Sequence, residues 1–245
     1  MSDSIVPSLS AELLVRMSYN IDFKDKILKL MGSAAKVSAL SGSPQGKDFR
    51  AFASQLSAAR SWMKFLKIIR STPDLLNPAR DIMSFNIKSA SAQDFSKLFL
   101  RKAEFVADIV QMLAEDVSTL HRGRVWSSGL RMKPISNISV IEQRAWWVWS
   151  LLAALNSYIE LKKVRIEYDA TPDSSELKIK YYLVLFKFVK FACEVVDASI
   201  ALTPDHIKTV RPGAFELVSI AAGSVSAISS LHKLLYTESI GIALK

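Results

Sequence analysis

The chain has few of the residue types that build loops, disulfides and metal sites. Glycine and proline number eight each among 245 residues, and cysteine occurs once, at Cys193. This scarcity of glycine and proline disfavours a loop-rich enzyme or an all-β architecture and favours long, uninterrupted helices. A single cysteine excludes an internal disulfide and gives no indication of an oxidising compartment.

Motifs for catalysis are missing as well. His121, His206 and His232 fall in separate segments, and none has a glutamate or cysteine at metal-ligand spacing. The sequence contains no P-loop, no dinucleotide fingerprint and no nucleophile elbow. We therefore predict that the protein is not an enzyme and that it uses no metal or cofactor.

The chain is strongly basic, with a formal net charge of +9, and half of its residues are hydrophobic. The mean hydropathy is +0.20. A basic balance suits either nucleic acid or an anionic membrane surface. Here the basic residues alternate with large apolar ones, and the aromatic residues cluster with apolar residues rather than among arginines, unlike nucleic-acid modules that stack bases. We predict binding to anionic phospholipids and no nucleic-acid partner.

Turn-forming stretches divide the chain into helical segments. No stretch shows the period-two alternation of a β-strand, so the predicted fold class is all-α. We expect an N-terminal region of amphipathic helices facing the cytosol, residues 1–125, and a membrane-embedded helical region, residues 126–245. The predicted helices cover about 10–40, 48–71, 92–121, 139–166, 175–202 and 213–236.

Two helices are candidates for embedding in a bilayer. Ala145–Ile159 and Leu217–Leu231 are both uncharged, and the first begins with three tryptophans of the kind that sit at headgroup level. Both are shorter than the roughly 20 residues that the hydrocarbon core requires. We predict about two short membrane-embedded helices, and a buried helix in a soluble bundle stays open as the alternative for each.

A further helix, Lys180–Leu202, confines its charges to one side. Its charged residues fall within about 100° of one another on a helix. The pattern is typical either of a solvent-facing stripe on a bundle helix or of an interfacial helix. The residues are Lys180, Lys187, Lys190, Glu194 and Asp197.

The most distinctive segment runs from Phe49 to Arg70 and contains no acidic residue and no proline. Arg60, Lys64 and Lys67 fall within about 60° of one another on a helix, and bulky apolar side chains occupy the opposite arc. Such a helix is typical of a membrane interface. The alternative is a helix packed on a protein core with its basic face in solvent. The predicted membrane-binding residues are Arg50, Phe52, Leu56, Arg60, Trp62, Met63, Lys64, Phe65, Leu66, Lys67, Ile69 and Arg70.

Several segments, taken in order, are similar to a known family. They are Asp25–Leu30, Lys36–Leu40, Ser54–Arg60, Phe65–Lys67, the tryptophan-rich run at 146–149, Val196–Leu202, Pro212–Phe215 and Ser226–Leu235. Their pattern resembles the peroxin-11 family of peroxisomal membrane proteins over most of the chain, and Gln55–Arg70 matches the family's membrane-remodelling helix.

The resemblance implies a role in peroxisome elongation, fission and proliferation. It also implies homo-oligomerisation, contact with the organelle fission machinery and cytosolic termini, in the peroxisomal membrane or in the glycosomal membrane of a trypanosomatid. Since neither end of the sequence shows a secretory signal or a Ser-Lys-Leu address, we expect any targeting signal to be internal. A channel or metabolite-permeability protein in the same membrane is the alternative, and a soluble helical interaction module is a third possibility.

Overall fold

A computed structural model describes residues 11–42, 44–65, 92–122, 138–172 and 174–243. Within these ranges every regular element is a helix, and the prediction of an all-α fold is confirmed. The helices are α1 (Ala11–Tyr19), α2 (Ile21–Leu40), α3 (Gly46–Lys64), α5 (Ala92–Arg122), α6 (Ile138–Ala170), α7 (Ser175–Leu202), α8 (Asp205–Lys208) and α9 (Pro212–Ala243).

Local capping sets several helix ends. The side chain of Asn20 accepts hydrogen bonds from the N–H groups of Asp22 at 2.9 Å and Phe23 at 3.2 Å. This cap starts α2 and divides the helix predicted at 10–40 into two. Ser174 caps α7 in the same way, through the N–H of Leu177 at 3.3 Å. Gly42, with φ of 74°, forms the turn between α2 and α3, in a conformation that glycine adopts without steric cost.

Helix α3 is shorter than the helix predicted at 48–71. It ends at Lys64, and Phe65 has an extended backbone with ψ of 136°. Because this conformation cannot continue a helix, the prediction of a helix running through Phe65 is wrong at that residue. The rest of the predicted membrane-binding segment, 66–70, lies outside the described residues.

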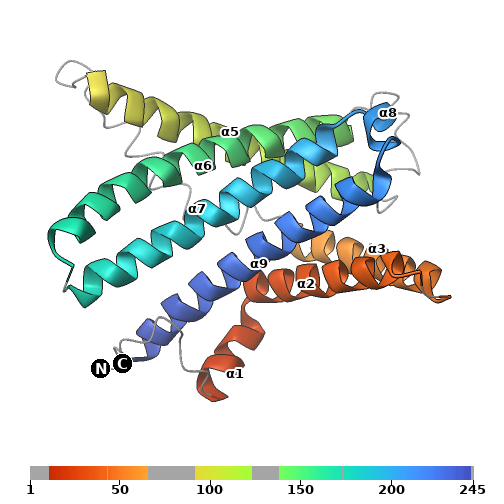
Figure 1. Ribbon diagram of the computed structural model, residues 1–245, viewed down its shortest axis with the longest axis horizontal. Helices are drawn as coiled ribbons and strands as arrows, with labels where there is room; N and C mark the ends of the chain where they lie inside the picture. The colour runs from red at the N-terminus through yellow and green to blue at the C-terminus, as the bar shows by residue number, and fades with distance from the viewer. Residues whose placement is uncertain (1–10, 43, 66–91, 123–137, 173, 244–245) are drawn as a thin grey trace.

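The long helices pack as neighbours in the order α5, α6, α7, α9 (Figure 1). The α2–α3 hairpin lies against one side of this row. Helix α2 packs on α9, and the C-terminal end of α3 contacts α5 through Lys64 and Glu115. The hairpin therefore covers the row from α9 to α5, and this arrangement creates the cavity described below.

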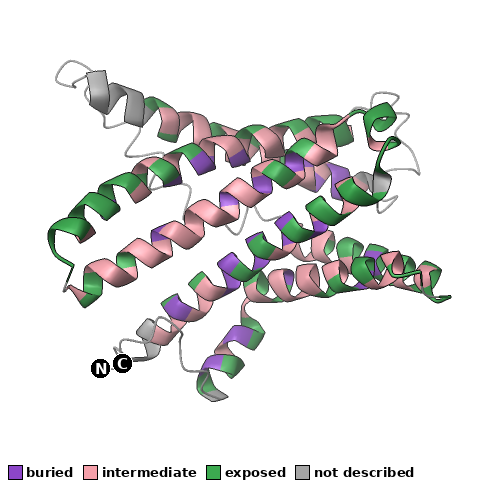
Figure 2. Cartoon of the chain, viewed as in Figure 1, coloured by how far each residue is buried: buried purple, intermediate pink, exposed green. Residues whose placement is uncertain are grey.

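Many side chains inside this fold are small or polar, and they lie beside larger apolar ones such as Leu13, Met17 and Met112. A cluster of Ala153, Ala154 and Phe191 joins α6 to α7, and buried positions are interspersed along the helices rather than gathered in one large core (Figure 2). Small side chains allow helix backbones to approach closely, as they do in membrane bundles. The largest side chains that are almost fully buried are Leu13, Met17, Met112, Thr119, Asp25, Ser150, Ser157 and Ser226.

One helix among the described residues is long and apolar enough to cross a membrane. It is the segment Gly213–Ser239 of α9, with a mean hydropathy of 1.5, and it contains the predicted segment Leu217–Leu231. The other predicted segment, Ala145–Ile159, does not meet this criterion within α6. Its uncharged run is closely flanked by Arg144 on one side and Glu160 on the other.

Candidate functional site

The predicted membrane-binding residues of α3 do not share one environment. Arg50, Phe52 and Trp62 are exposed, whereas Leu56, Arg60, Met63, Lys64 and Phe65 are partly buried. Leu66, Lys67, Ile69 and Arg70 lie outside the described residues.

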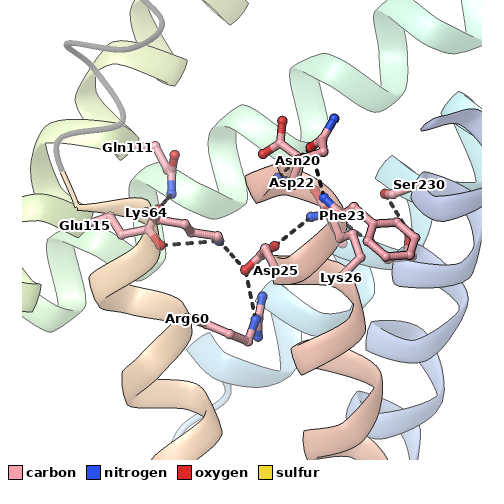
Figure 3. Close-up of polar contacts among 12 residues, drawn as sticks. Asn20, Asp22, Phe23, Asp25, Lys26, Arg60, Lys64, Gln111, Glu115 and Ser230 are labelled. Carbon is pink, nitrogen blue, oxygen red and sulfur yellow. Dashed lines mark hydrogen bonds and ion pairs between the residues drawn. The ribbon is translucent and has the colours of Figure 1, made fainter. Parts of the chain in front are cut away.

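Arg60 and Lys64 point into the protein, where they meet acidic side chains (Figure 3). Arg60 donates from Nε to Asp25 Oδ1 at 3.0 Å. The ammonium of Lys64 lies 3.4 Å from Glu115 Oε1 on α5 and 3.9 Å from Asp25 Oδ1. Glu115 also accepts a hydrogen bond from Gln111 at 3.0 Å. Part of the basic stripe of α3 therefore binds carboxylates inside the fold.

Asp25 is the acidic centre of this cluster, and only 2% of it is exposed. Lys26 adds a third cation, with its ammonium 3.1 Å from Asp25 Oδ2. Burial by itself would raise the pKa of the Asp25 carboxyl group. The positive charges of Lys64, Lys26 and Arg60, with the Arg60 hydrogen bond, outweigh burial and hold this pKa well below its usual range.

The cluster belongs to the wall of a cavity of about 770 Å³ between the hairpin and the helical row. Charges of opposite sign lie on its two sides. The hairpin side, the basic wall, carries Lys26, Lys29, Arg60 and Lys64, with Asp22 and Asp25 as its acids. The row side, the acidic wall, carries Glu115, Glu142, Glu194 and Asp197, with Lys190 as its one cation.

Lys29 lies where α2, α7 and α9 meet. A Cβ added to Gly223 of α9 would lie 3.3 Å from Lys29 Cε and 3.6 Å from Asp197 Oδ2, so the absence of a side chain at Gly223 makes room for the lysine. Burial lowers the pKa of Lys29 to about 8, against the opposing influence of Glu194 and Asp197. Among the described residues no ion pair within 4.0 Å engages its ammonium.

The acidic wall is joined to α9 by serines. Ser226 donates to Glu194 Oε1 at 2.9 Å, and Ser219 donates to Asp197. Glu194 is 6% exposed, and its second oxygen, Oε2, accepts no hydrogen bond from the described residues. This oxygen is thus a buried acceptor on a residue that lines the cavity.

Two tryptophans of α6, Trp146 and Trp149, also line the cavity. Trp149 packs edge-on against Phe191 with ring centroids 5.4 Å apart. The ammonium of Lys190 lies 4.3 Å from the centroid of Phe191. Near them, Trp147 donates from its indole N–H to Ser199 at 2.9 Å. The tryptophan run predicted to mark a headgroup level therefore borders the charged cavity.

The charged stripe predicted on α7 divides between two environments. Lys180 and Lys187 form ion pairs with Glu167 and Glu160 of α6, each at 2.9 Å. Glu194 is instead buried against α9. The interpretation of the whole stripe as solvent-facing or interfacial is therefore wrong at Glu194, because α9 covers that part of α7 with its serine-rich face.

Sequence reasoning missed the acidic partners of the basic helix. Asp25, Lys26 and Lys29 form a charged stretch of α2, but nothing local indicates that Asp25 contacts Arg60. Among the described residues no group of three or more histidine, cysteine, aspartate or glutamate side chains could hold a metal ion. The side chains that line the cavity are mostly charged or able to form hydrogen bonds.

Comparison of the chain with protein-family models, with curated proteins and with solved structures finds no match.

Proposed function

We propose that the protein is a peroxisomal or glycosomal membrane protein that remodels its membrane and promotes elongation, fission and proliferation of the organelle. The proposal includes self-association and contact with the fission machinery, as the resemblance to the peroxin-11 family implies. We place α9 across the bilayer and α3 at its surface.

The observation that carries the membrane part is the combination of polar side chains buried inside the fold and apolar stripes on its surface. Asp25, Thr119, Ser150, Ser157 and Ser226 are almost fully buried, while large apolar side chains are exposed. Scattered exposed apolar residues are common in soluble proteins, but continuous apolar stripes mark interaction surfaces. The exposed apolar residues are Phe99, Val106, Val110 and Leu113 on one face of α5, and Leu217, Val218, Val225 and Ile228 on one face of α9.

Helix α3 supports the remodelling part. It packs chiefly on α2, and its outer surface carries Phe52 and Trp62, each 44% exposed. Arg60 and Lys64 hold the opposite side of the helix to the protein. We infer that α3 enters a leaflet through its exposed aromatic side, and that phosphate contact by Arg60 or Lys64 would require their carboxylate pairs to open. A shallow wedge of this kind expands one leaflet relative to the other.

The first experiment asks whether the chain is integral to a membrane. Membranes from cells that express the tagged full chain are washed with alkaline carbonate, and the protein is followed in pellet and supernatant. We expect retention in the pellet, because α9 would be buried in hydrocarbon. Complete extraction would contradict the membrane part and favour the soluble interaction module.

The second experiment tests the role of α3 with a matched pair of substitutions. Phe52→Glu and Ser54→Glu each add one carboxylate to an exposed position of the same helix, on different sides. The full chain is reconstituted into liposomes, and their deformation is scored by electron microscopy. We expect Phe52→Glu to abolish tubulation and Ser54→Glu to retain most of it. Equal behaviour of the two variants would exclude insertion through the aromatic side.

A second candidate function is supported by the charged cavity. A polar cavity inside a membrane bundle is a feature of proteins that let charged solutes pass. Purified protein is therefore also tested for conductance in planar bilayers. Conductance without liposome deformation would favour a channel or metabolite-permeability protein and would contradict remodelling.

A further inference from the structure

In the cavity between the hairpin and the row, most basic side chains lie on one wall and most acidic side chains on the other. Its basic wall holds four cations and two acids, while its acidic wall holds four acids and one cation. A ligand with a single sign of charge would be attracted by one wall and repelled by the other. A ligand that carries both signs, a few ångströms apart, fits both walls.

The anionic part of such a ligand has a place beside Lys29. This lysine is partly buried, lines the cavity and makes no ion pair within 4.0 Å among the described residues, although Glu194 and Asp197 lie near enough to raise its pKa. Lys26 lines the same wall and adds positive charge there. Lysine ammonium groups are common binders of phosphate, acting as point charges with several donors.

The cationic part has a place on the opposite wall, at Glu194. The Ser226 hydroxyl occupies Oε1, and Oε2 has no donor among the described residues, although a buried carboxylate oxygen is costly to leave unsatisfied. Oε2 exposes less than 1 Å² of surface, so an ammonium with N–H groups would supply that donor once the Glu194 side chain turns toward the cavity. Trp146 and Trp149 line the cavity as well and offer aromatic faces to a cation.

We propose that this cavity binds a zwitterion consisting of a phosphate ester and a primary ammonium, the chemistry of the phosphoethanolamine headgroup. Lys29 and Lys26 take the phosphate, and Glu194 accepts from the ammonium. The ligand is either a phosphatidylethanolamine lipid or free phosphoethanolamine. The lipid source rests on the proposed membrane location, whereas binding of the free zwitterion does not.

Native mass spectrometry of the full chain in mixed micelles tests the proposal. Phosphatidylethanolamine, phosphatidylglycerol and phosphatidylcholine are offered in equal amounts. Phosphatidylglycerol lacks the ammonium, and phosphatidylcholine lacks the N–H donors that Glu194 requires. We expect phosphatidylethanolamine to be retained about tenfold better than either, a ratio that corresponds to about 1.4 kcal/mol. Equal retention of either competitor would overturn the proposal.

Two substitutions locate the site. Glu194→Gln keeps the size of the side chain and an acceptor for Ser226, and Lys29→Met replaces a partly buried charge with an apolar chain of similar length. Each should lower retention of phosphatidylethanolamine about tenfold. Glu167→Gln and Lys180→Met, which alter the exposed ion pair at the far end of α7, serve as controls. If Glu194→Gln does not fold, Lys29→Met decides, and unchanged retention by a folded Lys29→Met variant would overturn the site.

A separate titration with water-soluble phosphoethanolamine distinguishes the sources. Saturable binding that is weakened by Lys29→Met identifies the free zwitterion as a ligand, and selective retention of the lipid alone identifies the membrane as the source. Binding of neither would refute the proposal even for a carbonate-resistant protein. Binding of the free zwitterion by a carbonate-extractable protein would support this site while refuting the membrane function.

Discussion

Arg60 of α3 reaches back across the hairpin and donates its Nε–H to the buried carboxylate of Asp25 on α2, at 3.0 Å. The pair joins residues 35 positions apart in the chain. It fixes which side of α3 faces inward, and it leaves the aromatic side chains of α3 exposed. We expect the stability of the hairpin and the charge balance of the cavity to depend on this contact.

Asp25→Asn should destabilise the protein by about 3 kcal/mol, because it leaves Arg60, Lys26 and Lys64 without their common partner in a buried site. Asp22→Asn is the matched control. Asp22 is exposed in the first turn of α2, where its charge contributes about 0.5 kcal/mol at most through the helix dipole. Denaturant unfolding in detergent, followed by circular dichroism, measures both. A loss below 1 kcal/mol for Asp25→Asn would show that the cluster is solvated.

Asp25 should also make the protein sensitive to acid. Its pKa in the folded state lies below the value of about 3.9 in the unfolded chain, so the unfolded chain takes up the proton first as the pH falls. The stabilisation is therefore complete above about pH 5 and is lost progressively below it. Unfolding midpoints at about pH 7 and about pH 3.5 should differ more for the wild type than for Asp25→Asn. If the wild type and Asp25→Asn lost the same stability between these two pH values, other carboxylates would be responsible for the acid sensitivity.

Lys29, unlike Asp25, should destabilise the fold in its charged form, and this destabilisation should disappear in alkali. Its folded-state pKa of about 8 lies below the unfolded value of 10.5. The unfolded chain thus binds more protons between these values, and Lys29 makes stability rise with pH across that window. In lipid-free detergent, Lys29→Met should be more stable than the wild type by about 2 kcal/mol near pH 7, and the difference should shrink toward about pH 10. A constant difference would show that Lys29 is not desolvated.

Gly223 should tolerate only small side chains. A Cβ there would lie 3.3 Å from Lys29 Cε, whereas a Cβ on Gly32 would meet nothing within 4 Å. Gly32→Ala should therefore stabilise α2 by about 0.5–1 kcal/mol, and Gly223→Ala should change stability by less than that amount. Gly223→Leu should destabilise the α2–α9 contact, and Lys29→Ala should restore part of the loss in a double-mutant cycle. Full additivity would place Lys29 away from Gly223.

Ile228 distinguishes a lipid-facing surface from a water-facing one. It is 54% exposed near the middle of the candidate span. In a membrane, Ile228→Lys should impede insertion, at about 3 kcal/mol for a lysine at the helix centre. In water, the same change should be neutral. Val210→Lys, in the exposed connection between α8 and α9, is the control. The fraction retained after a carbonate wash measures both, and equal retention would place α9 outside the bilayer.

Much of the helical organisation follows from local signals in the sequence. The break at Thr171 and Pro172, the cap at Ser174 and the turn at Gly42 each act within a few residues, so the predicted ranges for α5, α6 and α7 agree closely with the structure. The differences are also local. Asn20 interrupts the first helix, and Phe65 ends α3 before the amphipathic pattern ends.

Local signals in the sequence could not predict which side of each helix faces the protein interior. A helical wheel gives angles between residues of one helix, and it correctly groups Arg60 with Lys64. It cannot show that Asp25 and Glu115, from two other helices, meet them inside the fold. Composition and periodicity thus predicted an all-α chain with two short apolar segments and a basic amphipathic segment, and among the described residues one of the two apolar segments lies in a helix that is apolar enough to cross a membrane. Only tertiary packing decided that these basic residues face acidic side chains across a cavity, because the opposing charges come from helices far apart in the sequence.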